Sequence, residues 1–145
     1  MQITDLATEQ KLLPLLRQAF RPMFLFGAAF SAIAMLLWGL ILAGQLNIQP
    51  VGQVLFWHSH EMLFGFAAAS IAGFLLTALT EFTGSAALPP RPVQRLVWLW
   101  LGGRVAYLLS GSVGIAWAAA LDMGFMLSLV AHSFGPLWRA PERRH

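Results

Sequence analysis

Cysteine is absent from the 145 residues, which excludes a disulfide framework, a thiolate metal site and a covalent haem-attachment motif. Charged residues are scarce at 10%, whereas a soluble domain usually carries about 25%. Hydrophobic residues make up 58%, and the mean hydropathy is +0.68. Such a chain has too little polar surface to cover a globule in water, so the composition predicts an integral membrane protein.

Several functional signatures are also missing. The chain has no Gly-rich phosphate loop, no Ser-His-Asp arrangement and no metalloprotease motif, which disfavours nucleotide binding and hydrolysis. Its net charge of +3 comes from arginines beside apolar runs and not from a basic stripe with interleaved aromatics. We therefore expect anchors at the membrane surface and no binding of nucleic acid. Because the start is polar and the first apolar run is long, we expect no cleaved signal peptide.

Four apolar runs predict the architecture. Each is long enough to cross a bilayer as a helix, and backbone groups in lipid must be satisfied within the segment. Short connections rich in Gly, Pro and Ser favour antiparallel neighbours. We expect an all-α integral membrane fold, an up-down bundle of four transmembrane helices over residues 23–138. Its helices are predicted at 23–43, 52–80, 93–110 and 113–137, with an interfacial segment at 1–22 and a basic tail at 139–145.

Basic residues predict the orientation. They lie before the first run, between the second and third, and after the fourth, whereas the other two connections have none. By the positive-inside rule both termini are cytoplasmic. Residues 12–20 are expected to lie on the cytoplasmic surface as a short helix, and tryptophans near the run ends suggest an interfacial belt. The basic residues are Lys11, Arg17, Arg21, Arg91, Arg95, Arg139, Arg143 and Arg144. The tryptophans are Trp38, Trp57, Trp98 and Trp138.

The most informative stretch opens the second helix and contains His58, His60 and Glu61. Ionisable groups in a membrane are rare and usually face the bundle or a water-filled cavity. His58 and Glu61 share a helix face with a small-residue stripe suited to close helix packing, made by Gly65, Ala69 and Gly73. His60 lies about 160° away from His58, so a regular helix cannot direct both at one metal ion.

Arg104 and Asp122 add charges in the third and fourth helices. Helix geometry places them about 9 and 13 Å below the outer surface, with Glu61 entering from the same side at a shallower depth. They are predicted either to form a structural ion pair or to line, with His58, His60 and Glu61, a polar pocket open to the periplasm. His132 lies about 28 Å down, which disfavours its sharing a haem with His58 or His60.

Two blocks of sequence resemble the NnrS family. WHSHEMLFGF at 57–66 and AGFLLTA at 72–78 match its signature, with weaker likeness in FRPMF at 20–24, WLGGR at 100–104 and Leu121-Asp122. The resemblance implies a multi-pass bacterial inner-membrane protein that is associated with haem and/or copper and with the response to nitric oxide. It favours His58 and His60 as cofactor and metal ligands, supported by Glu61, Arg104 and Asp122. Family members are considerably longer, and Glu81 departs from the family pattern.

Two other functions fit the same residues. The chain could be a truncated, non-catalytic membrane module that packs against other membrane subunits, or against its own copies, through the Gly65, Ala69 and Gly73 face. It could also be a small transporter subunit whose outer-half charges bind a solute. Nothing in the sequence by itself specifies catalysis.

Overall fold

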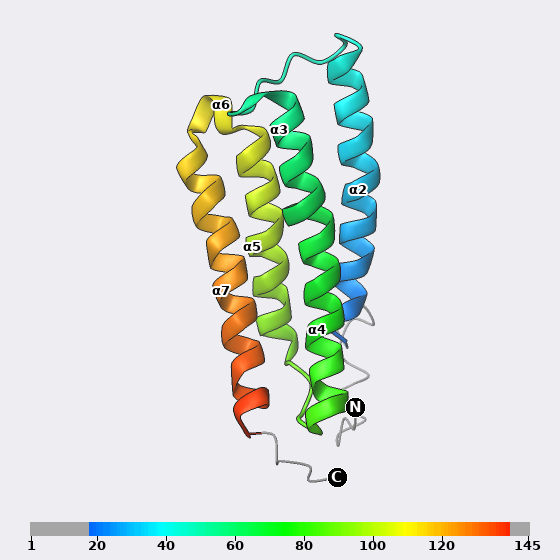
Figure 1. Ribbon diagram of the computed structural model, residues 1–145, viewed down its shortest axis with the longest axis vertical. Helices are drawn as coiled ribbons and strands as arrows, with labels where there is room; N and C mark the ends of the chain where they lie inside the picture. The colour runs from blue at the N-terminus through cyan, green and yellow to red at the C-terminus, as the bar shows by residue number, and fades with distance from the viewer. Residues whose placement is uncertain (1–17, 140–145) are drawn as a thin grey trace.

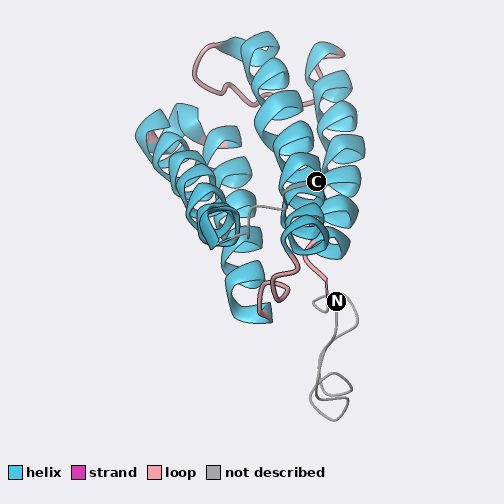
Figure 2. Ribbon diagram, turned by 60° about the horizontal axis from the view of Figure 1, so that its bottom comes forward, coloured by secondary structure: helices cyan, strands magenta, loops and turns pink. Residues whose placement is uncertain are grey.

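The computed structural model describes residues 18–139, and every regular element within that range is helical (Figures 1 and 2). Residues 53–83 form one continuous helical column, made of an α-helix, a π-helix and a second α-helix. The elements in chain order are α2 (Phe20–Leu42), α3 (Gln53–His60), the π-helix η2 (Glu61–Ala67), α4 (Ala68–Thr83), α5 (Pro90–Leu108), α6 (Ser110–Val113) and α7 (Ile115–Arg139).

Among residues 18–139, three helices are long and apolar enough to cross a membrane: Phe20–Leu42, Gln53–Thr83 and Ile115–Trp138. They agree with the first, second and fourth predicted spans. The helix at the third position, α5, runs alongside the others in Figure 1 but carries Arg91, Arg95 and Arg104 within 19 residues. Large apolar side chains such as Leu36, Phe74 and Leu127 are exposed on the outside of the bundle, as expected for helices surrounded by lipid. These features indicate a membrane protein, and the predicted third span, which corresponds to α5, remains a prediction.

The helix ends differ slightly from those predicted. α5 begins at Pro90, three residues before the predicted start, because proline is well accommodated in the first helical turn, where its missing N–H would have no helical partner. Residues 111 and 112, expected to connect the third and fourth helices, lie within the short helix α6 (Ser110–Val113). The predicted surface helix at 12–20 falls mostly outside the described residues, as do Lys11, Arg17, Arg143 and Arg144.

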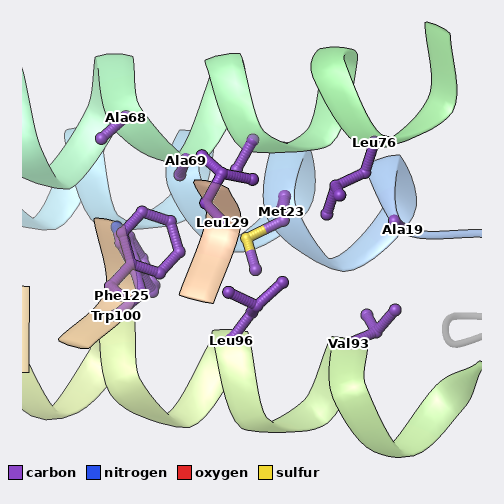
Figure 3. Packing of buried hydrophobic residues seen from close by; sticks show 11 residues of the cluster. Ala19, Met23, Ala68, Ala69, Leu76, Val93, Leu96, Trp100, Phe125 and Leu129 are labelled. Atoms are coloured by element: carbon purple, nitrogen blue, oxygen red, sulfur yellow. The ribbon is translucent and has the colours of Figure 1, made fainter. Parts of the chain in front are cut away.

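One apolar core is shared by the helices that lie side by side. α2 packs on α4, α5 on α7, and α4 also on α7. Figure 3 shows Met23, Leu96 and Leu129, from α2, α5 and α7, pointing toward one another across the small side chains of α4. In Figure 1, α2 begins and α7 ends at the same end of the molecule, as an up-down arrangement requires.

The predicted small-residue face does pack against another helix, which is α2 of the same chain. A Cβ on Gly27 would lie 3.1 Å from the Cβ of Ala69, and a Cβ on Gly73 would lie 3.1 Å from the Cβ of Met23. Gly65, Ala69 and Gly73 are buried. This face is therefore used within the fold, so it is not a free surface for another subunit.

Candidate functional site

A π-helix immediately follows His60. It covers Glu61–Ala67, whereas His58 and His60 both lie in the regular helix α3, so the two rings point to different sides of that helix. Within it, the carbonyl of Gly65 accepts a hydrogen bond of 2.8 Å from the indole Nε1 of Trp100 on α5. The ring of Phe30 on α2 occupies the space where a Cβ of residue 65 would lie, so only glycine fits there. Short π-helical segments inside α-helices occur frequently at functional sites.

Arg104 lies at the centre of a buried charged cluster. Its Nη1 is 3.1 Å from Glu61 Oε2, and its Nη2 is paired with Asp122 Oδ1. Glu61 is fully buried, Arg104 is 2% exposed and Asp122 is 7% exposed. The expected Arg104–Asp122 ion pair is present, and the missing side chain at Gly103 leaves room for the Asp122 carboxylate. The ion pairs join η2, α5 and α7, and each of these charges would be costly to bury without its partners.

His60 completes this cluster. Its Nδ1 is 3.5 Å from Glu61 Oε1, and its Nε2 is 3.4 Å from Asp122 Oδ2. The ring stacks on Phe64 at 4.5 Å and meets Tyr107 edge-on at 4.4 Å. His60 therefore contacts both carboxylates that flank the Arg104 guanidinium, and two carboxylates face one guanidinium in this cluster.

His58 lies apart from these groups. Its ring stacks on Trp38 of α2, with the centroids 4.0 Å apart and the planes at 6°. None of the ion pairs among residues 18–139 includes His58, and its Nδ1 is buried without a hydrogen-bond partner. The structure therefore brings together four of the five predicted pocket residues and places the fifth against Trp38.

The two histidines differ in their surroundings. Each has a buried Nδ1 without a hydrogen-bond partner, but no carboxylate pairs with His58 in the described residues. His60 has a carboxylate near each nitrogen, an arrangement that orients a ring but leaves neither side open. Between residues 18 and 139 no group of three His, Asp or Glu side chains is placed to hold a metal ion. His132 follows Asp122 by ten residues on α7, about 15 Å along the helix, which separates it from the cluster.

Several contact residues were missed by sequence reasoning. Tyr107 packs on His60, and its hydroxyl donates a 3.3 Å hydrogen bond to the carbonyl of Val51. Tyr107 is the single tyrosine of the chain, which is the one sequence feature that could have drawn attention to it. Trp38 and Trp57 were expected in an interfacial belt, but Trp38 stacks on His58 and Trp57 is only 1% exposed. That expectation was wrong for Trp57, because its bulk fills the core between the helices.

Comparison with known proteins places the chain in a family. No curated protein and no solved structure matches it. The family described as NnrS protein matches residues 14–145, which include the whole charged cluster, both histidines and the π-helix. Since that match covers nine tenths of the sequence, the chain belongs to the NnrS family.

Proposed function

We propose that this chain is an inner-membrane NnrS-like protein that binds haem or copper and acts in the response to nitric oxide. Family membership supports the proposal as a whole. The structural observation that carries it is the Nδ1 of His58, which is buried without a hydrogen-bond partner. His58 lies in α3, three residues before Glu61 of the charged cluster. Buried polar atoms normally have a hydrogen-bond partner, and His58, unlike His60, has no carboxylate beside its ring, so a bound metal could occupy this nitrogen.

Each residue has a defined part in this proposal. His58 would be the ligand, with its ring plane fixed by the stack on Trp38. His60, Glu61, Arg104 and Asp122 would hold a fixed set of charges beside it and keep His60 oriented. A bound haem or copper would supply the metal centre to which nitric oxide can attach. Tyr107 shields His60 on one side, which limits the access of water to the cluster.

The proposal includes four spans with both termini in the cytoplasm. α5 lies along three helices fit to span a membrane, and its Arg104 is paired inside the bundle instead of facing lipid. Because the chain has no cysteine, single cysteines can report the topology directly. An impermeant maleimide added to intact cells should label Gln45→Cys and leave Ala86→Cys unlabelled. Labelling of Ala86→Cys from outside would contradict the orientation.

The metal proposal is tested on detergent-purified protein expressed with haem and copper supplied. The measurements are an absorption spectrum and elemental analysis of the wild type and of a His58→Ala/His60→Ala double variant. We expect a haem band or stoichiometric copper in the wild type and its loss in the variant, with helical circular dichroism retained. Metal-free wild-type protein would count against metal binding by this chain alone.

A second candidate function is a non-catalytic module that assembles with other membrane proteins. It is favoured by the ion pairs that His60 makes with Glu61 and Asp122, which are contacts within the chain. Between residues 18 and 139, moreover, no group of three His, Asp or Glu side chains is placed to hold a metal ion. Colourless, metal-free protein that purifies with a stoichiometric membrane partner would support it. Since Gly65, Ala69 and Gly73 are covered by α2, such a partner would have to contact another surface.

A further inference from the structure

Trp100 is joined to the π-helix by a hydrogen bond to its backbone. Its side chain is 2% exposed, and its indole N–H donates to the carbonyl of Gly65. A carbonyl inside a π-helical turn is displaced from the regular i→i+4 pattern, so it is open to a donor from a neighbouring helix. Trp100 supplies that donor from α5, four residues before Arg104 on the same helix.

Phe30 holds this arrangement from the opposite side. Its ring meets the ring of Trp100 edge-on, with centroids 5.6 Å apart, and fills the space above Gly65. Gly65 is also close to the charged cluster, because a Cβ there would lie 3.1 Å from Glu61 Oε2. Phe30, Gly65 and Trp100 thus enclose the π-helix one turn after Glu61, where the register of the backbone decides the direction of the Glu61 side chain.

We propose that Trp100 is a positioning residue for the charged cluster. Its hydrogen bond to Gly65 holds the π-helical register that directs Glu61 to Arg104 and His60 to Asp122. Each residue of a helix advances by about 100° and 1.5 Å, so a return to regular α-helical pairing would turn α3 relative to α4 by that order. Glu61 would then leave Arg104. The proposal concerns how the cluster is held and is independent of whether a metal binds there.

The test measures the register directly in the full chain. Spin labels are attached to cysteines introduced at Leu55 in α3 and Phe74 in α4, two exposed positions on either side of the π-helix. Double electron–electron resonance then compares otherwise unchanged protein with Trp100→Phe. We expect Trp100→Phe to shift the mean distance by about 3 Å or more, because α3 rotates and slides along its axis. Unchanged distances in folded Trp100→Phe would overturn the proposal.

The matched control is Trp98→Phe. Trp98 lies on the same helix but is 70% exposed, so its replacement should leave the distance unchanged. An equal shift in Trp98→Phe would contradict a specific role for Trp100. If Trp100→Phe loses its helical circular dichroism, benzothienylalanine is placed at residue 100 instead, because it keeps the two-ring shape and lacks only the N–H donor. A shifted distance with this residue supports the proposal, and unchanged distances overturn it.

Discussion

Replacement of Arg104 by leucine should strongly destabilise the fold. Leucine approximates the apolar part of the side chain but leaves Glu61 and Asp122 facing each other without their guanidinium. Both carboxylates are nearly inaccessible, so water cannot compensate them. Removing one partner from a buried ion pair costs about 3–5 kcal/mol. We expect a loss of that size in the free energy of unfolding.

The assay is reversible unfolding in mixed micelles, followed by circular dichroism. Arg95→Leu is the control, because Arg95 is an exposed arginine on the same helix and should change the stability by less than about 1 kcal/mol. A triple variant, Arg104→Leu/Glu61→Gln/Asp122→Asn, removes all three charges and should recover more than half of the loss. The reasoning is refuted if Arg104→Leu is no worse than Arg95→Leu, or if the triple variant recovers nothing.

Two further predictions concern packing around the cluster. Gly65→Ala should lower the free energy of unfolding by about 1–3 kcal/mol, because its methyl group would collide with Phe30. The control Gly135→Ala places its methyl group in open space on α7 and should change the free energy of unfolding by less than about 1 kcal/mol. Similar losses in both variants would contradict a tight fit at residue 65. Tyr107→Phe should lower the free energy of unfolding by about 0.5–1.5 kcal/mol, because the carbonyl of Val51 loses its donor. An unchanged free energy of unfolding would show that this hydrogen bond does not stabilise the fold.

The long apolar runs and the main ion pair were predictable from the sequence. Lipid admits few backbone solutions, so uninterrupted apolar segments indicate helices and their rough ends. Arg104 and Asp122 are each costly in a membrane, and helix geometry placed them at similar depths; their pairing follows from both facts. Glu61 joins them for the same reason.

The backbone register and the roles of the histidines could not be predicted. The π-helix contacts Phe30 and Trp100, which lie far from Gly65 in the sequence and meet it only after the helices pack. A regular helix would have kept Glu61 on the face of His58, whereas in the structure it contacts His60. The stack of His58 on Trp38 is likewise a tertiary contact with no local signal.

The most direct test of the proposed site is titration of purified protein with haem and, separately, with copper(I), comparing His58→Ala with His132→Ala. His132 is the matched control, because it is a half-buried histidine on α7 well away from the cluster. We predict that wild type and His132→Ala bind one of the two cofactors equally well, and that His58→Ala loses that binding while keeping its helical circular dichroism. Unchanged binding by His58→Ala, or its loss in His132→Ala alone, would contradict the account.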